Sequence, residues 1–287
     1  MPHKFPSQVV CGVDFSDVSA EALRLAALLA MKTGARLSCV HAVAPEAPIY
    51  FTGANLAELE RQSRHSLEQE HAALKAFVGR ITQADDVDLR VGEGQAAALI
   101  LDAAGDTGAD MIVVGTQERS GVERLWLGSV AEAVVRDARV PVLVVPSTSA
   151  GSISGKVICA VRNSDISRTA LNRSAMLADA LGAELVVVNV LDHEQSGRTA
   201  QDLCAWASAE RSCAVQYVQK PIHGQAQLLD HIGGTGADLI VLGFERERFS
   251  VRTEHGSSVS DDLRHAHGPI LLIPKEYAFE TDTSGNI

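Results

Sequence analysis

Aromatic residues are scarce in this chain, because Phe, Trp and Tyr together make up 4% of its 287 residues. Apolar residues nevertheless account for 46%, so the core must be built mainly from Ala, Val, Leu and Ile. This composition is typical of helices that cover a mostly parallel sheet. The chain is about twice as long as a usual domain, which predicts two domains.

Basic charge is also lacking, because 25 Lys and Arg residues face 36 Asp and Glu residues, a formal net charge of −11. Binding to nucleic acid or to an anionic membrane needs a basic face, so we expect neither partner. No apolar run reaches the roughly 18 residues that span a bilayer, and no basic-then-apolar segment opens the chain. The five cysteines show no C-x-x-C spacing and are expected to be reduced thiols in a cytoplasmic protein.

Motifs for metal binding and nucleophilic catalysis are absent as well. His65 and His71 are six residues apart, which on a helix turns them about 120° from one another, with no Cys or carboxylate at ligand spacing. There is no G-x-S-x-G motif, and no cysteine has an evident histidine partner. We expect no resident metal, and at most slow ATP hydrolysis or self-phosphorylation at Ser129.

What the chain does contain is an internal repeat. The segment VDFSDVSAEALRLAALLAMKTGARLSCVHAV (13–43) aligns without gaps to VRNSDISRTALNRSAMLADALGAELVVVNVL (161–191). Likewise, TGADMIVVG (107–115) matches TGADLIVLG (235–243). The repeat predicts two copies of one domain in tandem.

The Ser/Gly-rich run STSAGSISGK separates the two copies and sets the expected boundaries. We assign residues 1–147 to the first domain, 148–155 to a linker, 156–275 to the second domain and 276–287 to a tail.

Short apolar runs alternate with helical patterns in each copy. In the first copy, a buried run ends before Asp14, a helix follows from a capping region at Ser16 to Ser19, and this helix ends at Gly34. Strands that alternate with helices predict an α/β fold, in which each copy is a doubly wound, mostly parallel sheet. The segment 44–86 is longer than its counterpart in the second copy, and it is a candidate contact or lid.

The residues quoted above resemble the universal stress protein family, in its tandem form. The likeness rests on VDFSDVSAEAL after the first strand, on GTQE followed by GSVAEAVV, and on a final VPVLVVP. The resemblance implies five-stranded sheets of order 3-2-1-4-5. Because each final strand would then be an exposed apolar edge, we expect these strands to pair antiparallel across the two copies as an intrachain pseudo-dimer. A further homodimer is left open.

The resemblance also implies an ATP site, with or without Mg²⁺, at the ends of the strands in the first copy. The family's loop has the pattern G-x2-G-x9-G-[ST], and here its second glycine is replaced by Glu118. The candidate site residues are Val13, Asp14, Ala42, Gly115, Glu118, Gly128, Ser129 and Val130.

Two interpretations of the loop remain open. A glycine at a strand end and a helix that begins at Gly128-Ser129 would together favour a phosphate. Alternatively, Ser129 and Glu132 spell the S-x-x-E capping box, which would satisfy the helix N–H groups without any ligand. The negative charge of Glu118 weighs against a triphosphate.

The second copy departs from the pattern, since Arg162 replaces the aspartate and Arg246 replaces the second glycine. We expect no ATP there, and leave open a degenerate repeat, a different anion, or ion pairs that close the pocket. The leading hypothesis is a stress-response protein that binds an adenine nucleotide and acts through interactions, with a protein partner still to be named. The alternatives are an interaction scaffold without nucleotide and a binder of another metabolite in the second copy.

Overall fold

The fold is described from a computed structural model. It describes residues 4–44, 56–84, 86–116, 127–147, 153, 155–161, 165–190, 205, 213–220, 232, 236–244 and 268–277. Site candidates Glu118, Arg162 and Arg246 lie outside these residues.

The first copy folds as alternating strands and helices. They are β1 (Gln8–Gly12), α1 (Asp17–Thr33), β2 (Arg36–Val43), α2 (Leu56–Ile81), β3 (Val87–Glu93), α3 (Ala96–Thr107), β4 (Met111–Thr116), α4 (Ser129–Asp137) and β5 (Val142–Pro146). The elements described in the second copy are β6 (Lys156–Val161), α5 (Asp165–Leu181), β7 (Glu184–Val190), β8 (Val215–Lys220), β9 (Leu239–Phe244) and β10 (Ile270–Pro274).

All ten of these strands form one sheet, in the order β3-β2-β1-β4-β5-β10-β9-β6-β7-β8. Each half therefore has the expected order 3-2-1-4-5. The pairs within each half are parallel, and β5 pairs antiparallel with β10, with Leu143 opposite Leu271. This confirms the predicted pairing of the two final strands, which removes both apolar edges from solvent.

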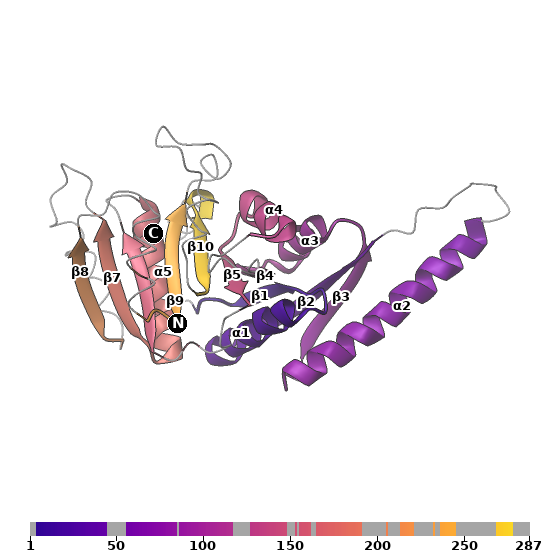
Figure 1. Ribbon diagram of the computed structural model, residues 1–287, viewed down its shortest axis with the longest axis horizontal. Coiled ribbons are helices and arrows are strands. Elements are labelled where there is room, and N and C mark those ends of the chain that lie inside the picture. The colour runs from indigo at the N-terminus through magenta and orange to yellow at the C-terminus, as the bar shows by residue number, and fades with distance from the viewer. Residues whose placement is uncertain are drawn as a thin grey trace, which may run out of the picture.

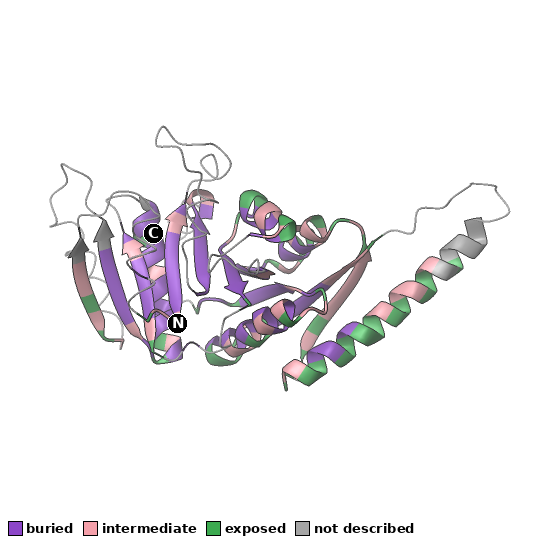
Figure 2. Cartoon of the chain, in the orientation of Figure 1, coloured by how far each residue is buried: buried purple, intermediate pink, exposed green. Residues whose placement is uncertain are grey.

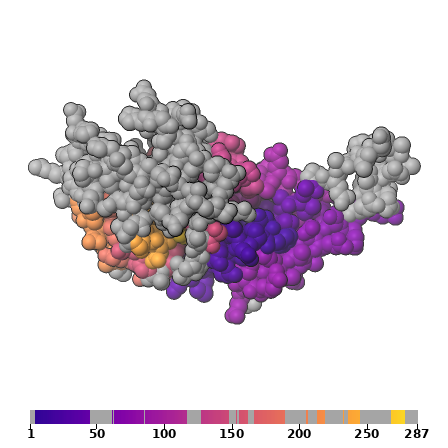
Figure 3. All heavy atoms as spheres, in the orientation of Figure 1, coloured from indigo at the N-terminus to yellow at the C-terminus, as the bar shows by residue number. Residues whose placement is uncertain are grey.

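Helices cover the sheet on two faces (Figure 1). One core cluster joins the sheet to α1, α2 and α5, and the other joins it to α3 and α4 on the opposite face. Burial follows this division, since the strands in the middle of the sheet are almost entirely buried (Figure 2). Helix α2 lies at the outer end of the first half, beside the edge strand β3 (Figure 1), and this half forms the indigo-to-purple side of the space-filling view (Figure 3).

Helix α1 illustrates how the sequence sets these elements. Ser16 caps it, because its hydroxyl accepts a hydrogen bond from the Ser19 N–H at 3.1 Å. Gly34 ends it with φ 72°, a left-handed conformation in which glycine carries no Cβ penalty. Ala22, Leu25 and the other positions on one stripe are fully buried. Both ends of this helix are where the sequence predicted them.

The proposed domain boundaries stay a prediction. Two described residues near them are packed: Ile153 of the expected linker is buried, and so is Tyr277 of the expected tail. The Tyr277 ring lies 5.3 Å from the guanidinium carbon of Arg173 in α5.

Candidate functional site

The site lies where the strand order of the first half reverses. Strand β1 is flanked by β2 on one side and β4 on the other, and the crossovers from these strands leave toward opposite faces. Ligands of doubly wound sheets bind at the carboxyl ends of the strands at such a switch point. The structure brings six candidate residues together there: Val13, Asp14, Ala42, Gly115 and Val130 line one cavity, and Ser129 precedes Val130 in α4.

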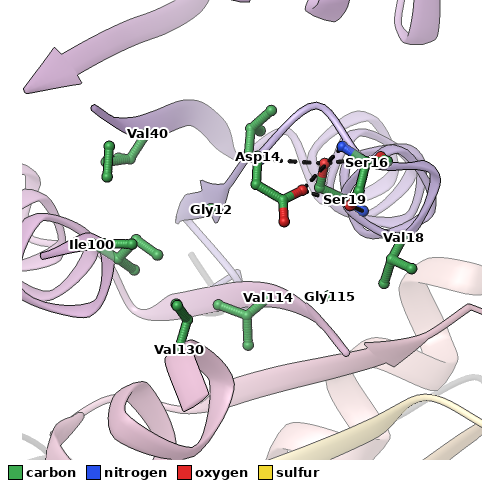
Figure 4. A pocket seen from close by; sticks show the side chains of 13 residues that line it. Gly12, Asp14, Ser16, Val18, Ser19, Val40, Ile100, Val114, Gly115 and Val130 are labelled. Carbon is green, nitrogen blue, oxygen red and sulfur yellow. Dashed lines mark hydrogen bonds between the residues drawn. The ribbon is translucent and has the colours of Figure 1, made fainter. Parts of the chain in front are cut away.

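This cavity, which we call the Asp14 cavity, has a volume of about 110 Å³. In the close-up view, Asp14 and Ser16 form one wall, and Val40, Ile100, Val114 and Val130 form the other (Figure 4). Most of the described lining is aliphatic or backbone, and among these residues Asp14 supplies the one carboxylate. Ile100 and Val40 were missed in the sequence, because α3 and β2 are distant in the chain and no motif marks a side chain that merely faces a cavity.

Asp14 is held by the start of α1. Its Oδ1 accepts hydrogen bonds from the Ser16 N–H at 3.0 Å and from the Ser16 hydroxyl at 2.5 Å. Its own N–H donates to the Ser19 hydroxyl at 3.3 Å. Partial burial by itself raises the pKa of Asp14, but the hydrogen bonds from Ser16 and Ser19 outweigh this and lower the pKa below 3.8. Asp14 is therefore an oriented anion at neutral pH.

The N-terminus of α4 differs from the capping-box interpretation. The helix begins at Ser129, and its N-cap is Gly128, with φ −63° and ψ 160° and no side-chain cap bond. Ser129 is thus one position too late to act as the cap, and the capping-box prediction is wrong. Val130 in this first turn is 39% exposed and lines the cavity. A first turn without a side-chain cap offers its N–H groups and the positive end of the helix dipole to an anion.

Gly115 has a packing role that the sequence did not reveal. It lies within β4, paired with Val145, and is not among the glycines with positive φ. A Cβ at this position would come within 2.8 Å of Val18 Cγ1 and 3.0 Å of the Val18 carbonyl oxygen. Gly115 therefore does not turn the chain with a positive φ, and instead it lets α1 approach β4 closely.

Ala42 lies inside β2, near its end. The Val13 N–H donates to the Val40 carbonyl at 2.9 Å, so the backbone of Val40 faces β1. Two residues further on, the backbone of Ala42 faces the same way. The β1–β2 pairing ends at Gly12 opposite Val40, so the backbone of Ala42 lies beyond the last paired residues, at the cavity wall.

Other chemistry is not visible in the described part of the chain. Among those residues, no cluster of three or more His, Cys, Asp or Glu side chains could hold a metal ion. Cys11, Cys39 and Cys159 are buried in the sheet, and burial raises the pKa of the Cys39 thiol to about 12. In the same residues, no helix is both long and apolar enough to cross a bilayer. None of the described α2 side chains lines the cavity, and whether segment 44–86 acts as a contact or a lid stays a prediction.

The fold and the site define a doubly wound α/β protein with a mostly aliphatic cavity at its switch point, into which the Asp14 carboxylate is placed. A model of the "Universal stress protein family" matches residues 7–146. A universal stress protein of Methanocaldococcus jannaschii is 34% identical over 140 residues, 48% of this chain and 81% of that one, and one of Thermus aquaticus is 34% identical over 137 residues, 48% and 96%. This chain belongs to the universal stress protein family.

Longer relatives extend the likeness. A universal stress protein of Mycolicibacterium smegmatis is 27% identical over 188 residues, and the alignment covers 63% of each chain. The crystal structure of a universal stress protein from Archaeoglobus fulgidus has a TM-score of 0.72 at 17% identity, covering 94% of this chain and 99% of that one. A Pseudomonas aeruginosa structure has a TM-score of 0.58 at 14% identity, covering 98% and 99%. These two structures support the fold of the whole chain.

Proposed function

We propose that the first half of the chain binds an adenine nucleotide, ATP, in the Asp14 cavity. The observation that carries the proposal is the meeting of two features in one cavity: the ionised carboxylate of Asp14 and the first turn of α4, which no described side chain caps. A nucleotide carries hydrogen-bond donors at one end and anionic phosphates at the other. The cavity matches both ends, because the Asp14 carboxylate accepts hydrogen bonds and the first turn of α4 favours an anion.

Charge decides the orientation of the ligand. The Asp14 carboxylate repels phosphates, so it must face the nucleoside, where a ribose hydroxyl or the adenine amino group can donate to it. The phosphates, with Mg²⁺ where ATP carries it, then lie toward Gly128 and Ser129. Ala42 presents backbone polar groups to the base, and Ile100 and Val40 contact its faces.

The output that we propose is a change in interaction rather than a chemical product. The described part of the cavity contains one carboxylate and no cysteine or histidine, so it offers no activated nucleophile. A role in stress follows from the family, and the tandem arrangement, the cytoplasmic location and a protein partner belong to the same proposal. The β5–β10 junction serves as the pseudo-dimer interface within one chain.

One observation favours a second candidate, an interaction scaffold without nucleotide. In the second half, a Cβ on Gly243 would come within 1.9 Å of Ile166 Cγ2, as a Cβ on Gly115 would approach Val18 in the first. The second half keeps this glycine although Arg162 replaces its aspartate. Packing alone therefore accounts for Gly115, and this glycine is no argument for a ligand.

The experiment that separates the two candidates begins with native protein. Freshly purified protein is denatured and the released small molecules are identified by mass spectrometry. Release of ATP, ADP or AMP near one per chain supports the nucleotide site. Absence of nucleotide, together with no heat on titration up to millimolar Mg-ATP, would leave the scaffold and the second-half metabolite site.

A further inference from the structure

The backbone around Asp14 is held from behind by a histidine of β2. The carbonyl of Val13, the residue before Asp14, lies 2.8 Å from His41 Nδ1. A carbonyl only accepts, so Nδ1 carries a proton and donates it. The pairing of β1 with β2 ends at Gly12. The imidazole N–H of His41 therefore takes the place of the β2 backbone N–H that would bond the Val13 carbonyl if the pairing continued.

The residue after Asp14 is held by the same histidine. Phe15 has φ 64°, a left-handed conformation that is an outlier for a bulky side chain. Such strain persists only where the surroundings impose it. The Phe15 ring lies 4.3 Å from the His41 ring and 5.4 Å, edge to face, from the ring of Phe77 in α2. Asp14 is thus bracketed by two residues that both contact His41.

His41 also reaches α2 directly. Its Nε2 lies 3.7 Å from Glu70 Oε2, a contact that becomes an ion pair when the imidazole is protonated. Ala42, the next residue along β2, has its side chain on the opposite face of the sheet, toward the cavity. At the end of β2, Ala42 therefore contacts the cavity, and His41 contacts the face of the sheet that α1 and α2 cover.

We propose that His41 is a positioning residue for the Asp14 cavity. By holding Val13 and Phe15, it aims the Asp14 carboxylate into the cavity, and through Phe77 and Glu70 it links that loop to α2. This inference rests on the proposed nucleotide site. Through these contacts, ligand binding at Asp14 is coupled to α2, which lies on the other face of the sheet.

The second half differs at these positions. In the gapless repeat, Asn189 stands in the place of His41, residue 163 is Asn in the place of Phe15, and Arg162 stands in the place of Asp14. The aspartate is thus lost together with the Phe15 ring, whereas Asn189 keeps a side-chain N–H donor at the place of His41.

The test compares three substitutions of His41 by Mg-ATP titration. His41→Asn keeps an N–H donor near the place of Nδ1, His41→Gln moves the donor toward Nε2, and His41→Phe keeps a ring but no donor. We expect about a fivefold loss of affinity in His41→Phe and His41→Gln, the worth of one net hydrogen bond, and affinity close to wild type in His41→Asn. His71→Phe, on the exposed side of α2, is the control and should change nothing.

A second readout needs no nucleotide. Amide hydrogen exchange in the ligand-free protein should be faster at Ser16, whose N–H donates to Asp14, in His41→Phe than in wild type, and restored in His41→Asn. If wild type binds no adenine nucleotide, the proposed function fails while this readout still tests His41. Equal exchange and equal affinity in all three variants would overturn the positioning role.

Discussion

Val18 in the first turn of α1 lies so close to Gly115 of β4 that a Cβ on Gly115 would come within 2.8 Å of Val18 Cγ1. The neighbouring backbone carbonyl of Val18 is 3.0 Å from the same point. Backbone does not yield as a flexible side-chain end does, so Gly115 sets the distance between the two elements that flank Asp14. A glycine in a nucleotide-loop motif is therefore a structural requirement here, whatever the ligand.

Gly115→Ala should destabilise the protein by about 1–3 kcal/mol, the usual cost of overpacking. The free energy of unfolding from denaturant titration measures this. Gly128→Ala is the matched control, because no described atom beyond its chain neighbours lies within 4 Å of a Cβ there and its φ of −63° suits any residue. We expect Gly128→Ala to stay within about 0.5 kcal/mol of wild type. Equal stability of the two variants would contradict the packing role.

Phe15 offers a direct measure of backbone strain. Phe15→Gly and Phe15→Ala both remove the ring contacts with His41 and Phe77, but only glycine relieves the φ of 64°. The glycine variant should therefore be more stable than the alanine variant by about 1 kcal/mol. Thermal or denaturant unfolding of the pair decides this, and a more stable alanine variant would show that the residue is not strained.

Asp14 makes the free energy of unfolding depend on pH in the acid range. Its pKa is lowered in the folded state, so the carboxylate favours folding above its ordinary pKa of 3.8, and this contribution is lost as pH falls through the lower folded value. Stability measured from pH 5 to pH 2 should fall more steeply in wild type than in Asp14→Asn. Parallel curves would mean that the bonds from Ser16 and Ser19 do not favour the ionised form.

Glu118, in the loop outside the described residues, should limit the affinity for ATP. Its charge would repel a triphosphate, by up to about 4 kcal/mol at 4 Å with an effective dielectric of 20 and by about 1 in water. We expect Glu118→Gly to tighten ATP binding about tenfold, as measured by titration calorimetry. Glu118→Gln keeps the bulk and removes the charge, so it should give most of the same gain. Unchanged affinity in both variants would exclude Glu118 as an obstacle.

Much of the fold could be predicted from sequence, because its signals are local or repeated. The cap at Ser16, the stop at Gly34 and the repeat required no knowledge of tertiary contacts. The junction of Leu143 with Leu271 followed from a simple physical argument, since two apolar edge strands need partners.

The candidate site was less predictable, because its details depend on contacts between distant residues. Ser129 matched a capping box, yet the extended backbone of Gly128 moved the cap one residue earlier. Gly115 matched a phosphate motif, yet its neighbour is Val18. The role of His41 rests on a bond to the Val13 carbonyl, 28 residues away, and no motif marks it.

The central claim is a single adenine-nucleotide site at Asp14, and titration calorimetry with Mg-ATP tests it most directly. Wild type, Asp14→Ala and Asp17→Ala are compared, since Asp17 is an exposed carboxylate three residues away that does not line the cavity. The account predicts one ATP per chain, affinity at least about tenfold weaker in Asp14→Ala, as expected for the loss of a charged hydrogen bond, and little change in Asp17→Ala. No binding by wild type, or equal affinity in the two variants, would contradict it.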